Sequence, residues 1–299
     1  NAPIIKLNGS SAGSNGITLS GTSDGSEIRG LMINDFSGFG VHIQSGAANI
    51  TIAGNWIGSD GTGDSSQGNT NNGIQVQGIN ATVGGTGLYD GNVINNNNNE
   101  GINITSSATG TLIQGNIIGL EADGSTGGGN ADVGIAVFSD GNTIGGTTLA
   151  ARNIISMNYE GIEINTSNNI VQGNYIGTDV TGTLDRGNRL DDGVEVQAGT
   201  NNLIGGDAEG AGNLIAFNQN DGVYIKGGTG TSVLGNIIHS NNQQGIDLGT
   251  TGVTNNDAGD GDTGANNLQN FPVLSSAITD TASSITIAGT LDTDGLNQD

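Results

Sequence analysis

NIISMNYEGIEINTSNNIVQGNYI, residues 153–176, decides the fold of this chain of 299 residues. It contains short runs of Ile and Val, each bounded by Asn, Gly, Ser or Gln. Apolar and polar residues alternate with period two inside the runs, and the residues between them favour turns, which together indicate β-strands. Three such strands separated by turns make one triangular coil.

Two patterns repeat along the chain. Gly-(Ile/Val)-x-(Ile/Val/Leu) begins at Gly16, Gly40, Gly73, Gly101, Gly134, Gly161, Gly193, Gly222 and Gly245. An Asn followed two residues later by Ile or Val occurs at Asn55, Asn92, Asn116, Asn153, Asn174, Asn213 and Asn236. Long and short spacings alternate, so the unit is a pair of coils of about 60 residues.

This regularity predicts an all-β fold: a right-handed single-stranded parallel β-helix, or β-solenoid, of about nine coils with three short strands each. A coil cannot bury its own apolar edge, so stacked coils form the core. The seven asparagines recur at one position, which favours an internal ladder of hydrogen-bonded amides over a ligand site. A β-sandwich would not repeat a single motif in register.

The composition limits the classes of partner. The net charge is −23, from 29 acids and 6 bases, and Cys is absent. Such a charge repels phosphate backbones and anionic lipid, so neither nucleic acid binding nor membrane insertion is expected, and divalent cations are the natural partners. No apolar run approaches the roughly 18 residues of a membrane helix, and the start lacks a signal-peptide layout. We expect a mature or excised segment.

Three segments carry a resemblance to a known family. Residues 173–179 with 181–183, residues 142–146 with 151–156, and residues 267–274 resemble the long coil, the short coil and the exit segment of right-handed β-helix repeats. These repeats belong to the pectin-lyase-like superfamily, as found in very long secreted or surface-attached bacterial proteins. The resemblance covers most of residues 16–274. It implies a β-helix over 1–271, and 272–299 as a C-terminal β tail or the start of a following β module.

The same resemblance leaves activity open, because that superfamily contains lyases, hydrolases, epimerases and non-catalytic adhesive members. Motifs resembling those of polygalacturonases and mannuronan epimerases are absent. Acids nevertheless concentrate on one predicted face, where the catalytic candidates of an enzyme would be Glu160, Glu163, Asp191, Asp192, Glu195, Asp221 and Arg189. Arg186, Tyr224 and Lys226 are predicted nearby. Carboxylates about 5 or 10 Å apart, one or two coils away, bracket the separations used by glycosidases. The alternative is that exposed positions of an acidic solenoid are simply acidic.

Metal sites divide by ligand type. Without Cys, and with His42 and His239 in distant coils, no zinc cluster is expected. Asp257, Asp260 and Asp262 alternate with small residues in one loop, which predicts a calcium site of oxygen ligands. Weaker calcium candidates lie in the long-coil loops at Asp60, Asp64, Glu121, Asp123, Asp179 and Asp185. A solvated turn is the alternative in each loop.

The sequence therefore favours a non-catalytic extracellular module, secreted or at the cell surface, that acts as a rigid spacer, surface adhesin or fibre subunit stabilised by calcium. Its expected partners are neighbouring copies or flanking domains, stacked end to end. One alternative is a polysaccharide lyase or glycoside hydrolase acting on an acidic glycan. Another is a glycan-binding module, for which the candidate stacking aromatics are Trp56, Tyr159, Tyr175 and Tyr224.

Overall fold

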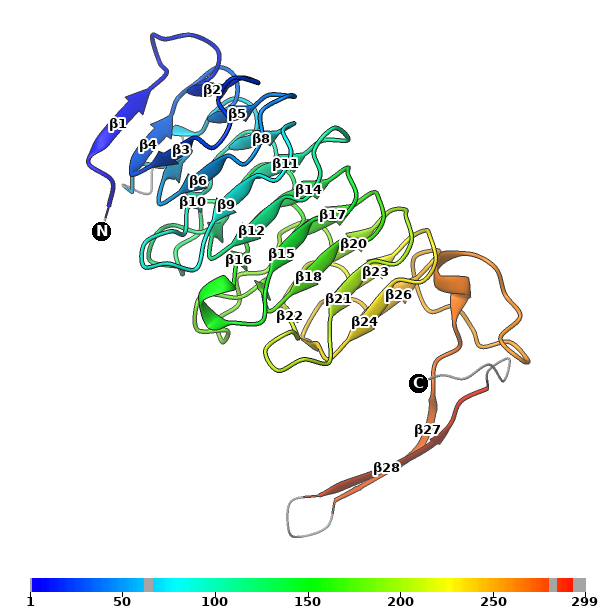
Figure 1. Ribbon diagram of the computed structural model, residues 1–299. Coiled ribbons are helices and arrows are strands. Elements are labelled where there is room, and N and C mark those ends of the chain that lie inside the picture. Colours follow the sequence, from blue (N-terminus) through cyan, green and yellow to red (C-terminus); the bar gives the residue numbers. More distant parts are fainter. Residues whose placement is uncertain (1, 62–66, 280–283, 293–299) are drawn as a thin grey trace.

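The computed structural model describes residues 2–61, 67–279 and 284–292. It confirms the predicted fold: short strands wind in a right-handed parallel β-helix whose coils stack along one axis (Figure 1). Three parallel sheets run along the stack, with nine, nine and eight strands in the described part of the chain. Within these sheets, every strand except the first and the last pairs with the strands one coil before and one coil after it.

The three sheets take their strands in rotation along the chain. The first sheet contains β1 (Ile5–Asn8), β4 (Leu31–Asn34), β7 (Trp56–Ile57), β10 (Val93–Ile94), β13 (Ile117–Ile118), β16 (Ile154–Ile155), β19 (Tyr175–Ile176), β22 (Leu214–Ala216) and β25 (Ile237–His239). The second sheet contains β2 (Ile17–Leu19), β5 (Val41–Ile43), β8 (Ile74–Val76), β11 (Ile102–Ile104), β14 (Ile135–Val137), β17 (Ile162–Ile164), β20 (Val194–Val196), β23 (Val223–Ile225) and β26 (Ile246–Leu248). The third sheet contains β3 (Glu27–Arg29), β6 (Thr51–Ala53), β9 (Thr82–Gly84), β12 (Leu112–Gln114), β15 (Thr143–Gly145), β18 (Ile170–Gln172), β21 (Leu203–Gly205) and β24 (Ser232–Leu234).

Identical positions of successive coils lie directly over one another. In the second sheet Ile102 pairs with Ile74 on one side and Ile135 on the other, and all three side chains are buried. The residue between two inward positions, such as Asn103, points outward. The core is therefore columns of Ile and Val running along the axis, and the outer face is a set of columns of polar residues.

The seven asparagines predicted as a ladder lie at the corner between the third and first sheets. Each side-chain amide donates to the Oδ1 of the next asparagine along the axis, from Asn55 through to Asn236, at 2.9 to 3.1 Å. Each backbone N–H donates to the same oxygen. The ladder thus supplies hydrogen-bond acceptors to backbone N–H groups at the corner, which have no partner in the sheets.

Two further asparagine series occupy the other corners. Between the first and second sheets, amides bond along the axis at 2.9 to 3.4 Å through Asn69, Asn97, Asn130, Asn158, Asn188, Asn218 and Asn241. A shorter series of Asn142, Asn169 and Asn202 lies between the second and third sheets. The sequence patterns above did not identify either series, although the first precedes each Gly-Ile start by three to five residues.

The C-terminal end of the stack is covered by a short segment. The 3₁₀ helix η3 (Ala265–Leu268) follows β26, and its Ala265 is buried in the core. Asn266 bonds to the backbone of Thr231 in both directions, at 2.9 and 2.7 Å. A second 3₁₀ helix, η2 (Leu149–Ala151), lies between coils.

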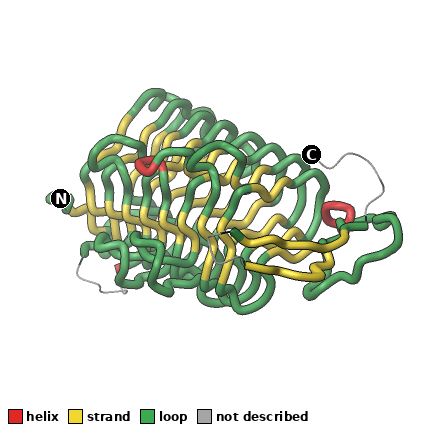
Figure 2. Tube along the Cα trace, turned by 90° about the horizontal axis from the view of Figure 1, so that it is seen from below, coloured by secondary structure: helices red, strands yellow, loops and turns green. Residues whose placement is uncertain are grey.

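An antiparallel hairpin of β27 (Val273–Thr279) and β28 (Ile285–Thr290) follows η3. Figure 1 shows it projecting away from the stack, and Figure 2 shows the coils from below as turns of one continuous tube. Large apolar side chains of the hairpin, including Leu274, Ile278 and Ile287, are exposed. Among the described residues, no helix has the length and apolar character needed to cross a membrane.

Candidate functional site

The outward column of the second sheet carries acids in its C-terminal half, at Glu163, Glu195 and Asp247. His42, Gln75, Asn103, Ala136, Glu163, Glu195, Tyr224 and Asp247 are register partners in successive strands from β5 to β26. Beside the C-terminal half of this column lies a hollow of about 370 Å³. We call it the acidic groove.

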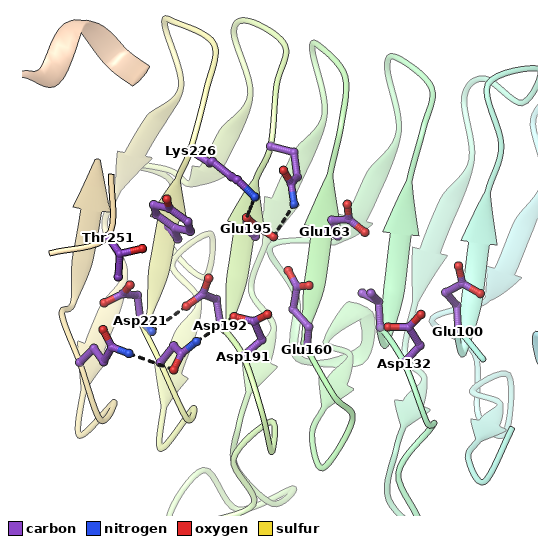
Figure 3. A pocket seen from close by; sticks show the side chains of 15 residues that line it. Glu100, Asp132, Glu160, Glu163, Asp191, Asp192, Glu195, Asp221, Lys226 and Thr251 are labelled. Carbon is purple, nitrogen blue, oxygen red and sulfur yellow. Dashed lines mark hydrogen bonds and ion pairs between the residues drawn. The ribbon is translucent and has the colours of Figure 1, made fainter. Parts of the chain in front are cut away.

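Eight carboxylates line the acidic groove: Glu100, Asp132, Glu160, Glu163, Asp191, Asp192, Glu195 and Asp221. The remaining lining residues are Val133, Gln197, Asn220, Tyr224, Lys226, Gln243 and Thr251. The groove therefore brings together every acid that the sequence singled out as a catalytic candidate. Figure 3 shows the carboxylates following one another along the coils.

Glu163 and Glu195 are direct register partners on β17 and β20, so their Cα atoms lie one coil apart. A neighbouring amide fixes each carboxylate, because Asn165 donates to Glu163 at 2.9 Å and Gln197 donates to Glu195 at 2.8 Å. In each pair the amide residue follows the glutamate by two positions along the chain. These contacts hold two carboxyl groups side by side facing the groove.

Glu160 is the most confined acid of the groove. Its side chain is only 5% exposed, and its Oε1 is buried without a hydrogen-bond partner. Burial, followed by the charges of Glu195 and Glu163, raises the pKa of Glu160 to about 10. Figure 3 shows its carboxyl directed towards the space between Glu163 and Glu195. Glu160 is therefore expected to carry its proton at neutral pH.

Asp192 and Asp221 precede the Gly of successive Gly-Val motifs and form a short ladder of their own. Asp192 accepts a hydrogen bond from the backbone N–H of Asp221 at 2.7 Å, and Asp221 accepts one from Gln244 at 2.6 Å. Burial raises the pKa of Asp192 to about 7, although the Asp221 N–H opposes the shift. Burial also raises the pKa of Asp221, Glu195 and Glu100. The groove as a whole therefore disfavours full ionisation.

Lys226 is the single basic residue among those lining the groove in the described part of the chain. Its Nζ lies 3.4 Å from Glu195. Arg189 and Arg186 do not line the groove, and Arg186 instead donates to the backbone oxygen of Ser125 in a long-coil loop. One ammonium consequently faces eight carboxyls, and the local charge stays strongly negative.

The predicted calcium loops use their acids as turn acceptors. Asp257 accepts from the N–H of Gly261 at 3.3 Å, and Asp260 accepts from the N–H of Asn270 at 2.7 Å. Asp257 also has a buried Oδ1 without a hydrogen-bond partner. In residues 2–61, 67–279 and 284–292, no three His, Asp or Glu side chains are grouped so as to hold a metal ion.

Acids of the long-coil loops are engaged in the same way. Asp179 accepts from the N–H groups of Thr183 and Leu184, each at 3.1 Å, and closes its own loop. Glu121 accepts from Ser59 Oγ at 2.9 Å, and so links two long coils. Asp123 bonds within its turn, Asp60 pairs with Lys6, and Asp185 accepts from Gly187. Asp64 lies outside the described residues.

The candidate aromatic residues are dispersed. Trp56 and Tyr175 belong to β7 and β19 of the first sheet, with three strands between them. Arg152 covers the Tyr175 ring at 3.8 Å. Only Tyr224 lines the acidic groove, where its hydroxyl donates to the carbonyl of Gly249 at 2.7 Å. His42 and His239 lie on different sheets, in β5 and β25.

Sequence reasoning missed part of the groove. Glu100, Asp132 and the polar neutral residues Asn220, Gln243 and Thr251 all line it. Glu100 shares the position before a Gly-Ile start with Glu160, Asp192 and Asp221, so the repeat alignment already contained that signal. Thr251 comes from the loop after β26, and no repeat pattern could place it.

No protein-family model, no curated protein and no solved structure matches this chain. The groove must accordingly be interpreted from its own geometry.

Proposed function

We propose that this chain is a non-catalytic structural module, a rigid extracellular spacer secreted from the cell or displayed on its surface. The observation that carries the proposal is continuity along the axis. Sheet register and the Asn55-to-Asn236 amide ladder run without interruption through the stacked coils. Every coil is bonded to its neighbours on three sides, which makes bending costly.

The repeats also support kinship with the pectin-lyase-like superfamily in its long secreted or surface-attached bacterial form. Within that proposal the chain separates whatever lies at its two ends by a fixed length. Calcium in the loop of Asp257, Asp260 and Asp262 would add stiffness near the hairpin. Stacking on neighbouring copies or flanking domains would extend the rod.

Removing one pair of coils tests the spacer. Deleting residues 116–173 joins Gly115 to Asn174, and this restores a Gln-Gly-Asn sequence that occurs at both cut sites. Strand β12 then leads directly to β19, and β10 takes β19 as its new partner. Two coils advance the axis by about 10 Å, so small-angle scattering should show a particle shorter by that amount.

Retention of the β-rich circular dichroism spectrum is the control for folding of the deletion variant. An unfolded variant would mean that the coils are not interchangeable units. A scattering profile typical of a flexible chain for the intact protein would refute the rigid spacer directly.

A second candidate function, polysaccharide cleavage, is favoured by one observation. Burial and neighbouring acids raise the pKa of Glu160 to about 10 within a close group of carboxyls, and glycoside hydrolases use such a raised pKa to keep one carboxyl as the general acid. Glu160→Gln should then abolish product release from a panel of acidic polysaccharides, with exposed Glu209→Gln as the control. Lack of product with the unmodified protein on every substrate would exclude this candidate.

A further inference from the structure

We infer that the acidic groove binds a linear amino-sugar polymer of the β-1,4-linked glucosamine class, whose ammonium groups pair with carboxylates of successive coils. The inference goes beyond the spacer proposal and does not depend on it. It rests on four features of the groove: its charge, its linear spacing, its unpartnered buried acid and its neutral polar end.

The negative charge of the acidic groove favours a cationic ligand. Eight carboxyls and one lysine line the groove, and that lysine is already paired with Glu195. A polyuronate would bring more negative charge, and a neutral glycan would cover carboxylates without compensating them, which is unfavourable in both cases. A ligand ammonium instead makes charge-assisted hydrogen bonds with the carboxylates.

The carboxyls lie in a row along the axis, and this arrangement favours an extended ligand. The carboxylates are carried by successive coils, which lie about 4.8 Å apart along the axis. No three acids of the described residues converge as a metal site requires. A single compact ion therefore meets too few oxygens, whereas a chain with one ammonium per sugar carries repeated charges along the row of carboxyls.

Glu160 supplies the independent indication of a ligand. Its side chain is 95% buried, its Oε1 has no hydrogen-bond partner in the protein, and its carboxyl points into the groove. A buried polar atom without a partner is costly. A donor from a ligand that lies between Glu163 and Glu195 would reach this oxygen and remove that cost.

The C-terminal part of the groove distinguishes an amino sugar from a simple polyamine or a basic peptide. Gln197, Asn220, Gln243, Tyr224 and Thr251 offer amide, hydroxyl and aromatic surfaces next to the acids. Asn220 and Gln243 form a linked series, since Gln243 donates to Asn220 at 3.0 Å and Asn220 donates to Asp191 at 2.9 Å. Sugar hydroxyls can use these groups, and a sugar ring can pack against Tyr224.

The test is a calorimetric titration of the full chain with a glucosamine hexamer at pH 6, where the sugar amine is protonated. We expect binding that weakens as salt is added. The fully N-acetylated hexamer, which has the same length without charge, should not bind. Equal binding of the acetylated hexamer, or no binding of either, would overturn the inference. Equal binding of a lysine pentamer would assign the groove to a basic peptide instead and would also overturn it.

Two double variants with the same change in net charge locate the site. Glu163→Gln with Glu195→Gln should weaken binding by about tenfold or more, because two charged contacts are lost. Asp207→Asn with Glu209→Gln alters exposed acids of the turn after β21 and should leave affinity unchanged. Equal losses in both variants would mean non-specific attraction and would refute the site. Circular dichroism of both variants confirms that they fold.

Discussion

Asn153 lies in the middle of the amide ladder that runs from Asn55 to Asn236 and allows the strength of that ladder to be measured. The side chain is fully buried. Its Oδ1 accepts from the backbone N–H and the side-chain amide of Asn116, at 2.9 and 3.0 Å. Its Nδ2 donates to the carbonyl of Ile113 and to Oδ1 of Asn174, both at 2.9 Å.

Asn153→Ala removes these four contacts at once. The Asn116 amide keeps other acceptors, and Asn174 Oδ1 keeps the backbone N–H of residue 153. One buried group, the backbone N–H of Asn116, then loses its partner, whereas the carbonyl of Ile113 keeps its place in the sheet pairing of β12 with β15. At about 1–3 kcal/mol for an unsatisfied buried group, the free energy of unfolding should fall by about 2 kcal/mol.

Urea denaturation followed by circular dichroism measures this loss as a shift in the unfolding midpoint. The control is Asn98→Ala, an exposed asparagine, which should change the free energy of unfolding by about 0.5 kcal/mol or less. Equal midpoints for the two variants would refute the energetic role of the ladder.

Asn153→Asp gives an independent check with nearly the same shape. A carboxylate there would face Oδ1 of Asn174 and the Ile113 carbonyl, both acceptors. Its folded-state pKa should therefore rise, and the stability of this variant should fall as pH increases from 4 to 8. An unchanged pH profile relative to the parent protein would show that the facing oxygens do not matter.

Three further predictions concern the corner turns, the groove and the calcium loop. Gly119 has a φ of +95°, and a Cβ there would collide with the backbone oxygen of Ser156. Gly141 has a φ of +74°, but the space around it is open. Gly119→Ala should therefore lower the melting temperature more than Gly141→Ala, and equal melting temperatures would contradict the steric argument. The folded-state pKa of Glu160 is about 10, above its unfolded value of about 4.5, so the stability it contributes is complete below pH 4.5 and is lost as pH rises towards 10. Thermal melts from pH 5 to 9 should therefore fall less steeply for Glu160→Gln, and parallel curves would rule out the raised pKa. If Asp257, Asp260 and Asp262 bind calcium, a chelator should lower the melting temperature of the protein but not that of Asp257→Asn. An unchanged melting temperature of the parent protein with chelator would argue against the site.

The repeat made the fold predictable because a solenoid uses one local rule many times. The Gly-Ile and Asn-x-Ile patterns located the second-sheet and first-sheet strands, and the register pairs Ile102 with Ile135 as the repeat requires. Strand lengths were less predictable. The sequence indicated only that the strands are short, and β7 and four other first-sheet strands have just two residues. The turn at the asparagine ladder takes residues out of the strand pairing, so these first-sheet strands are shorter than their apolar runs suggest.

The groove was predictable where its residues share repeat positions. Glu160, Asp192 and Asp221 precede a Gly, and Glu163 and Glu195 occupy the outward position, so alignment of coils placed them on one face. Arg189 could not be placed in this way, because its position in a long-coil loop depends on how that loop folds back. Its side chain does not line the groove, and its guanidinium lies next to Gly129.

The sequence by itself determined the coil, the axis and the outward columns, because strict periodicity leaves stacked strands few ways to bury Ile and Val. Tertiary structure decided which atoms lack partners and which charges face one another. Glu160 looks in sequence like any acid before a Gly, yet its burial among Glu163, Glu195 and Asp192 raises its pKa to about 10 and leaves one oxygen unpaired. Burial and charge crowding depend on neighbours contributed by other coils, and those neighbours come together only when the chain has wound.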